Sequence, residues 1–296
     1  MSTKAGRRPI ELDMNTDRNY VLGLRLGSYA VRSMLTDIKG RPVAQMELPI
    51  DARGPRAEIL AAMLSCSRRL LQKHSIPPSS LAGIGIAAPG AVDFRTGICH
   101  YSPRHPNWKN VALKERFERE FSVPCFVDHV NNCFALSEKL FGFGRGLNDF
   151  VCVLLGTGVS AGIVIHGEVY RGADCYSGEF GHTCIDMDGP VCSCGNRGCV
   201  EAYTSGPALV RMAAEELKSR GGLRRAHSPL RSKSITGEAV CAAARQGDAA
   251  ALAVLRRMGI YLGIGVSNLI NLFNPERVIL GGQVSKASEY FLPAFR

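Results

Sequence analysis

One imidazole and three thiols lie close together in the segment from Gly181 to Glu201, which reads GHTCIDMDGPVCSCGNRGCVE. These four candidate ligands are His182, Cys192, Cys194 and Cys199. Thiolate sulfur and imidazole nitrogen fill the four positions of closed, tetrahedral zinc sites. Gly195 and Gly198 allow the backbone to turn tightly between ligands. The segment therefore predicts a structural zinc that stiffens the loop without taking part in chemistry, and a cluster of reduced thiols is the alternative.

The other cysteines of the chain, which has eleven in all, have simpler explanations. Thiols of a cytosolic protein are mostly reduced. Five cysteines in apolar surroundings are expected to be small core residues, namely Cys66, Cys125, Cys133, Cys152 and Cys241. Cys99 and Cys175 fall in loop-like stretches and receive no role, and Cys184 is not expected to be a zinc ligand.

Composition indicates a globular protein without a membrane span. Hydrophobic residues make up 46% and charged residues 21% of the 296 residues, as in soluble domains with a sizeable core. We find no run of about 18 apolar residues, and the polar, basic stretch from Met1 to Pro9 lacks the apolar region of a secretion signal. A cytoplasmic location without membrane contact is the expectation.

The formal charge of +10 raises the question of nucleic-acid binding. Much of the basic excess lies between Lys218 and Lys233. Glycine, serine and proline interrupt this stretch, so it is expected to be a mobile surface loop. Contact with DNA through this loop is the alternative.

A β-β-β-α-β-α order occurs twice along the chain and predicts a duplicated α/β protein with two lobes. In the first lobe, strands are expected over 20–26, 30–37, 42–48, 81–87 and 124–128, with helices over 58–74 and 113–121. In the second, a helix over 132–141 and a strand, glycine turn and strand over 150–165 precede helices over 207–218 and 237–272 and a strand over 277–280. The expected division is an N-terminal segment over 1–19, a first lobe over 20–131 and a second lobe over 132–296.

Four motifs resemble the ROK family, which is named for repressors, uncharacterised reading frames and kinases. They are GIGIAAPGAVD from Gly83 to Asp93, GEFGH from Gly178 to His182, the CSCGNRGCVE loop, and NLFNPERVILGG from Asn271 to Gly282. The resemblance extends from about Gly6 to the end of the chain. It implies an actin-like (ribonuclease H-like) duplicated sugar-kinase fold with sugar bound in the cleft.

Two carboxylates that the resemblance leads one to expect in a kinase are absent. The family's first turn reads D-x-G-G-T, and here Arg25 and Tyr29 stand at the aspartate and the threonine. The family's catalytic segment E-N-D-A-N matches Asp128 to Asn132, so Val130 occupies the position of the general base. A valine cannot accept a proton, and the chain is therefore expected to have no kinase activity.

Asp128 and His129 are the neighbours that could replace the missing base. If all three residues continued one strand, Asp128 would face the same way as Val130 but lie about 6–7 Å away. His129 would face the other side and remains a conceivable base. Proton transfer by Asp128 is not expected over that distance.

Glycine turns are the candidate phosphate-binding elements. The residues with this expected role are Gly156, Thr157, Gly158, Gly281 and Gly282. Backbone amides of such turns can bind a phosphate, although a plain hairpin uses the same residues.

Some of the sugar-contact residues that the resemblance implies are present in this chain. Glu179, His182 and Glu201 match the family's sugar-reading positions, His129 replaces an asparagine, and Asn107 of the HPNW motif is a further candidate. The expected ligand is a hexose, an N-acetylhexosamine or a sugar phosphate. The alternative is that the glutamates and His182 only support the zinc loop.

The N-terminal stretch from Gly6 to Gly23 resembles the junction that follows the helix-turn-helix of ROK repressors. The family adds further helix and strand after Gly282, so a fragment or truncated product is expected, and DNA binding would need a helix-turn-helix from outside the chain. The first hypothesis is a sugar-sensing domain of a transcriptional regulator, a homo-oligomer by analogy. The alternatives are an Mg-ATP-dependent hexose or N-acylhexosamine kinase (a sugar 6-phosphotransferase) and a scaffold that binds no sugar.

Overall fold

The computed structural model describes residues 19–219 and 235–295. The chain divides into two compact units, residues 1–128 and 129–296. The expected regulator-like junction over residues 1–18 and the basic stretch over 220–233 lie outside the described residues.

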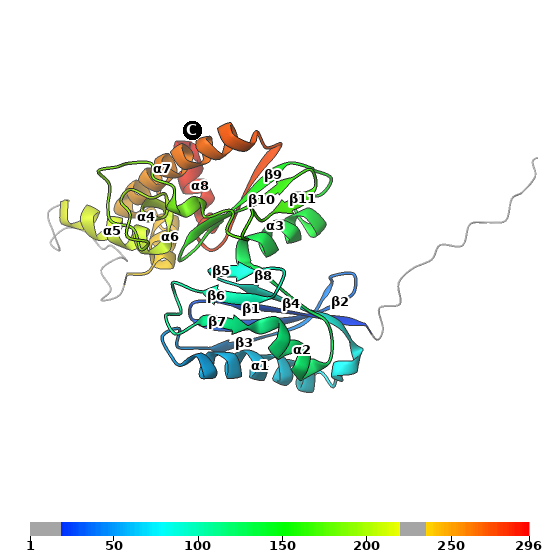
Figure 1. The fold of residues 1–296 in the computed structure, drawn as a ribbon. Coiled ribbons are helices and arrows are strands. Elements are labelled where there is room, and N and C mark those ends of the chain that lie inside the picture. The colour runs from blue at the N-terminus through cyan, green and yellow to red at the C-terminus, as the bar shows by residue number, and fades with distance from the viewer. Residues whose placement is uncertain (1–18, 220–234, 296) are drawn as a thin grey trace, which may run out of the picture. The chain divides into compact units, whose positions relative to one another are not determined.

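A five-stranded sheet with the order β3-β2-β1-β4-β8 organises the first unit (Figure 1). Its strands are β1 (Tyr20–Leu26), β2 (Ala30–Asp37), β3 (Pro42–Pro49), β4 (Leu81–Ala88) and β8 (Cys125–His129). The first three strands pair antiparallel, whereas β4 pairs parallel with β1. Alternate residues Leu22, Leu24 and Leu26 are buried, because successive side chains of a strand face opposite sides of the sheet.

Two helices cover the apolar side of this sheet, α1 (Arg56–Lys73) and α2 (Leu113–Phe121). A small second sheet, β5 (Ala91–Asp93), β6 (Ile98–Tyr101) and β7 (Lys109–Ala112), lies between β4 and α2 in sequence. The sequence did not predict this sheet, because strands of three or four residues are too short to show a periodic pattern.

The second unit repeats the plan of the first. Its four-stranded sheet has the order β11-β10-β9-β12, in which an antiparallel meander is again followed by a strand parallel to the first. The strands are β9 (Phe150–Leu155), β10 (Val159–Ile165), β11 (Glu168–Tyr170) and β12 (Arg277–Gly281). The repeated strand order confirms the predicted duplication.

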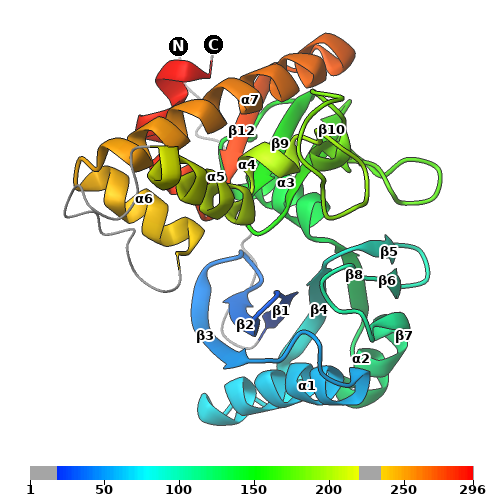
Figure 2. The ribbon, with the colours of Figure 1, turned by 90° about the vertical axis from the view of Figure 1, so that its left-hand side faces the viewer.

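Helices cover both faces of the second sheet, as Figures 1 and 2 show. Phe150 and Cys152 of β9 face α3 (Val130–Phe141), while Val151 and Val153 face the core made with the later helices. Those helices are α4 (Glu201–Thr204), α5 (Gly206–Ser219), α6 (Gly237–Arg245), α7 (Ala249–Phe273) and α8 (Ser288–Phe291).

The single helix expected over 237–272 is in fact two helices, and that expectation was wrong. Gly247 has a φ of +79°, which ends α6. The carboxylate of Asp248 then accepts hydrogen bonds from the amides of Ala250 and Ala251 and caps the start of α7. A glycine followed by an N-cap residue was the signal of this break in the sequence.

Within the described residues, α7 is the one helix long and apolar enough to cross a membrane. No such segment was expected from the sequence. Half of its most apolar window is buried inside the second unit, where Leu255, Met258 and Leu262 belong to the main core. This burial is consistent with a core helix of a soluble protein.

Candidate functional site

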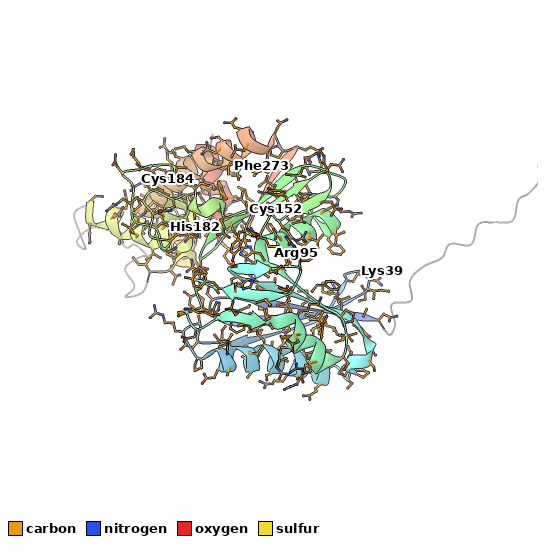
Figure 3. The ribbon with its side chains drawn as sticks, viewed as in Figure 1. Lys39, Arg95, Cys152, His182, Cys184 and Phe273 are labelled. Carbon is orange, nitrogen blue, oxygen red and sulfur yellow. The ribbon has the colours of Figure 1, made fainter. Side chains whose placement is uncertain are left out.

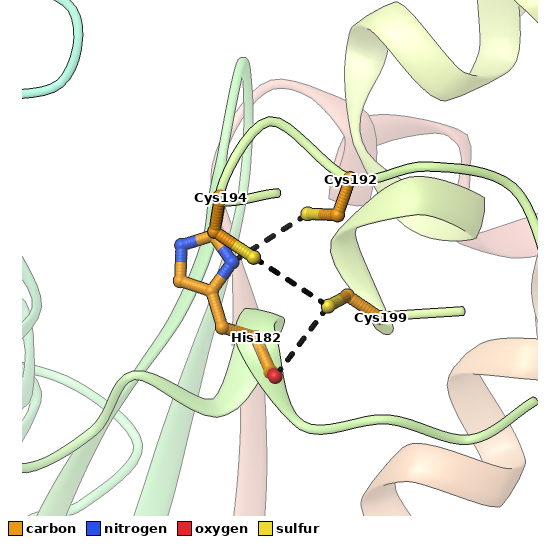
Figure 4. Close-up of side chains that lie close together, drawn as sticks. All are labelled: His182, Cys192, Cys194 and Cys199. Atoms are coloured by element: carbon orange, nitrogen blue, oxygen red, sulfur yellow. Dashed lines mark hydrogen bonds between the residues drawn. The ribbon is translucent and has the colours of Figure 1, made fainter. Parts of the chain in front are cut away.

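The four predicted zinc ligands meet on the segment between β11 and α4 (Figure 4). Their ligand atoms all lie within 4.8 Å of one another. The Sγ atom of Cys192 is 3.6 Å from Nδ1 of His182, and the Sγ atoms of Cys194 and Cys199 are 3.8 Å apart. One histidine and three cysteines thus form a compact group, the zinc-ligand cluster.

These separations suit a tetrahedral zinc ion. With Zn–S bonds of about 2.3 Å and Zn–N bonds of about 2.0–2.1 Å, tetrahedral angles place two sulfurs about 3.8 Å apart and sulfur and nitrogen about 3.5 Å apart. The distances of 3.6 Å and 3.8 Å given above agree with these values, and the other ligand atoms lie within 4.8 Å of one another. The cluster could therefore hold a structural zinc ion with no open coordination position.

Backbone turns bring the ligands together. The amide of Cys192 donates to Asn196 O at 2.7 Å, and the amide of Gly195 donates to Cys192 O at 3.0 Å. Gly198 has a φ of +64°, and a Cβ atom there would lie 1.5 Å from Asp186 O. Only glycine fits at this position, as the sequence predicted for the gaps between ligands.

The three glutamate and histidine candidates for sugar contact all lie at this loop. Nε2 of His182 faces Oε2 of Glu179 at 3.8 Å, while its Nδ1 faces the thiols. In a metal-binding histidine, one ring nitrogen binds the metal and the other commonly faces a carboxylate, a backbone carbonyl or water. Glu201 is buried and joins the loop to β10, because it accepts hydrogen bonds from Ser193 Oγ at 2.8 Å and the amide of Val159 at 2.9 Å. Glu201 therefore has a structural task, whatever contact it also makes with a ligand.

Asn107 lies in the first unit, on the loop between β6 and β7. Its side-chain amide donates to Arg53 O at 2.8 Å and Gly54 O at 3.3 Å, which holds the segment before α1. Its Oδ1 atom is the part that can accept a hydrogen bond from a hydroxyl group. The neighbouring His105 is fully buried.

Val130 is the first residue of α3, not a continuation of β8, which ends at His129. The condition under which Asp128 and Val130 would share one strand face is therefore not met. The chain turns into a helix at this point, and side chains no longer alternate between two faces.

His129 belongs to a buried polar network that the sequence did not reveal. Asn131 is fully buried, its amide nitrogen donates to Ala161 O, and its Oδ1 atom accepts from Nδ1 of His129 and the amide of Asn132. Because the amide nitrogen of Asn131 donates to Ala161 O, its carbonyl oxygen is the atom that faces the His129 ring.

The glycine turns have packing reasons of their own. Gly156, Thr157 and Gly158 form the hairpin between β9 and β10, where the amide of Gly156 donates to Gly158 O at 2.9 Å. Gly282 has a φ of +95°, and a Cβ atom there would lie 2.1 Å from Leu155 O, while one on Gly281 would meet the Phe134 ring at 2.3 Å. Their predicted role in binding phosphate stays a prediction.

Arg25 lies on β1 beside Arg32 of β2, and Arg32 makes an ion pair with Glu47 at 2.6 Å. Tyr29, in the following turn, is 75% exposed. The end of β1 thus carries a cation, and the turn after it carries an exposed ring.

Comparison with known proteins identifies the family. The model described as the ROK family matches residues 21–296. The chain belongs to the ROK family.

Relatives of this ROK protein include both repressors and kinases. The xylose repressor of Bacillus spizizenii is 31% identical over 99% of this chain and 72% of the repressor. The transcriptional dual regulator NagC of Escherichia coli is 31% identical over 99% of this chain and 70% of the regulator. A glucokinase of Halalkalibacterium halodurans is 33% identical over 94% of this chain and 84% of the kinase.

Solved ROK structures confirm the predicted two-lobed, actin-like sugar-kinase fold. A ROK glucokinase from Streptomyces griseus, in complex with glucose and AMPPNP, matches with a TM-score of 0.82 and 30% identity over 94% of this chain and 87% of that chain. A ROK transcriptional regulator homologous to the Escherichia coli MLC protein matches with a TM-score of 0.84 and 30% identity over 95% of this chain and 69% of that chain.

Proposed function

We propose that this ROK protein is a sugar-sensing domain of the transcriptional-regulator type that does not phosphorylate its ligand. The observation that carries the proposal is Val130 at the start of α3, at the position that matches the general base of the family's kinases. An alkyl side chain cannot accept the proton of the attacking hydroxyl, and no change in its surroundings can make it a base. Arg25 supports the same conclusion, because a cation there would repel magnesium.

The alignments with regulators extend over slightly more of this chain than those with kinases. The xylose repressors and NagC align over 99% of this chain, and the glucokinases of Halalkalibacterium halodurans and Thermotoga maritima align over 94% and 72%. This difference in length adds a minor argument for a regulator.

The proposed ligand is a hexose, an N-acetylhexosamine or a sugar phosphate, held by Glu179, His182, Glu201, Asn107 and His129. Carboxylates suit this task because each oxygen accepts hydroxyl hydrogens in a fixed direction. The proposed cofactor is one structural zinc ion at the zinc-ligand cluster. We further propose a cytoplasmic homo-oligomer that contacts DNA only through a helix-turn-helix supplied elsewhere.

Thermal unfolding with a panel of hexoses, N-acetylhexosamines and their 6-phosphates tests the proposal, because a ligand bound only by the folded state raises the midpoint. We expect one sugar class to raise the midpoint, no further rise with Mg-ATP, and no sugar-dependent ATP turnover. The double variant R25D/V130D, which restores both carboxylates, is expected to gain turnover. Sugar-dependent ATP turnover by the unaltered protein at ordinary kinase rates would contradict the proposal.

The second candidate function is an ATP-dependent sugar kinase in which His129 is the base. It is favoured by the glucokinase relatives and by the position of His129, an imidazole directly before Val130 at the end of β8. Replacing His129 by glutamine would then abolish turnover, and an active variant would exclude His129 as the base.

A further inference from the structure

Cys184 is a thiol to which neither the zinc-ligand cluster nor the sugar contacts assign a role. It is exposed and lies two residues after His182 in the second unit (Figure 3). The backbone pairs Cys184 with the ligand Cys199 in an isolated antiparallel bridge. Cys184, which does not belong to the zinc-ligand cluster, is therefore the cross-strand neighbour of Cys199, which does.

The hydrogen bonds around this bridge determine the kind of pair. The amide of Ile185 donates to Gly198 O at 2.9 Å, and the amide of Val200 donates to Thr183 O at 3.0 Å. Both bonds flank Cys184 and Cys199 and neither joins them, so the two form a non-hydrogen-bonded pair. The Cα atoms of such a pair are about 4.5 Å apart, and both side chains stand on the same face. Disulfides join Cα atoms about 4.4–6.8 Å apart, so this pair can be bridged by side-chain rotation alone.

We propose that Cys184 and Cys199 are an oxidation site at which a peroxide forms a disulfide, and that this disulfide expels the zinc ion. Cys184 is exposed, whereas Cys199 is fully buried, so a peroxide reaches Cys184 first. The Cys184 sulfur attacks hydrogen peroxide, the O–O bond breaks, and a sulfenic acid and one water form. The Cys199 thiolate then attacks the sulfenic sulfur, the S–O bond breaks, and the leaving hydroxide takes up a proton from solvent. One thiol, one thiolate, one peroxide and one solvent proton thus become one disulfide and two waters.

Loss of Cys199 is sufficient to open the metal site. A disulfide sulfur is no longer a thiolate, so His182, Cys192 and Cys194 remain as three ligands for a metal that structural sites hold with four. The other cysteines of this region are not equivalent to Cys184. Cys192 and Cys194 are in the ligand set, and Cys175 is buried.

The test uses the zinc-loaded protein and hydrogen peroxide. Zinc release is followed with a chromogenic chelator, and the disulfide is mapped by mass spectrometry after alkylation and digestion with trypsin and Asp-N. This digestion places Cys184 on peptide 174–185, Cys192 and Cys194 on 188–197, and Cys199 on 198–211. We expect peptides 174–185 and 198–211 to become linked as one equivalent of zinc leaves, and dithiothreitol with added zinc to reverse both changes.

Matched variants separate Cys184 from the cysteine that shares its peptide. Cys184→Ala is expected to hold zinc as the unaltered protein does but to lose the linkage and release zinc at least tenfold more slowly in peroxide. Cys175→Ala is expected to retain both the linkage and the fast release. Each of three results would overturn the proposal: a bridge from Cys199 to peptide 188–197, equally fast zinc release from Cys184→Ala, or a purified protein without zinc.

Discussion

At the scale of single residues, His105 shows how a buried group is held in one protonation state. Its Nε2 atom lies 3.1 Å from Gly27 O and its Nδ1 atom 2.9 Å from Ser102 Oγ. Gly27 O can only accept, so Nε2 carries the proton and Nδ1 accepts from the serine hydroxyl. His105 thereby joins the turn after β1 to the loop that carries Asn107, one of the proposed sugar contacts.

This arrangement predicts that acid destabilises the first unit. Burial and the nearby charge of Arg104 lower the pKa of His105, against the opposite effect of the hydrogen bond to Gly27 O. The unfolded chain therefore binds a proton at a pH where the folded chain does not, and the free energy of unfolding falls as the pH drops below about 6.5. The loss from this one group is at most about 1.4 kcal/mol per pH unit.

Urea unfolding at pH 7.5 and pH 5.5 measures this effect, with His105→Gln as the comparison. Glutamine can also donate and accept hydrogen bonds but has no proton to gain in this range. We expect the variant to lose less stability between the two pH values than the unaltered protein does. Equal losses would assign the acid sensitivity to other groups.

At the scale of elements, two glycines with positive φ end regular structure in different surroundings. Gly282 follows β12 with its φ of +95°, and a side chain there would meet Leu155 O at 2.1 Å. Gly247 follows α6 with a φ of +79°, and a side chain there would meet nothing within 4 Å. The first position is constrained by backbone conformation and packing, and the second by conformation alone.

We therefore expect Gly247→Ala to lower the free energy of unfolding by about 1–2 kcal/mol, the cost of a left-handed conformation for an L residue. Gly282→Ala should lose about 1–3 kcal/mol more, because its methyl group overpacks against a backbone carbonyl. Chemical denaturation of both variants measures the difference. Equal losses would mean that the end of β12 shifts freely away from β9.

At the scale of the whole molecule, the two units have separate cores and a repeated sheet plan. The proposed zinc site lies in the second unit alone, with Glu201 joining the loop to β10. We therefore expect zinc binding at this site to stabilise residues 129–296 and to leave the stability of the first unit unchanged.

Removal of zinc with a chelator under reducing conditions tests this independence by amide hydrogen exchange. We expect faster exchange in the zinc loop and around the start of β10, because the ligands then no longer restrain the loop. Peptides from residues 19–128 should exchange as before. Faster exchange throughout the first unit would show instead that the two units unfold together.

The sequence by itself determined the family, the duplicated strand plan and the four clustered ligands, because these depend on local spacing. Glycines between the cysteines and the alternation of apolar residues carry that information within about 20 neighbouring residues. The valine at position 130, where the resemblance leads one to expect a kinase's general base, was also visible, since the identity of a side chain needs no geometry. The glycine and N-cap residue that separate α6 from α7 at Gly247 were also a signal in the sequence, although the sequence analysis predicted one continuous helix.

Only the tertiary structure decided contacts between residues that are distant in sequence. The pairing of Asn131 with Ala161, of Glu201 with Val159 and of His105 with Gly27 joins segments that no periodic pattern relates. The same is true of the cross-strand pairing of Cys184 with Cys199, which depends on the register of two short loop segments. The register depends on how the backbone hydrogen bonds of the whole loop are satisfied together. The sequence of either segment alone does not determine it.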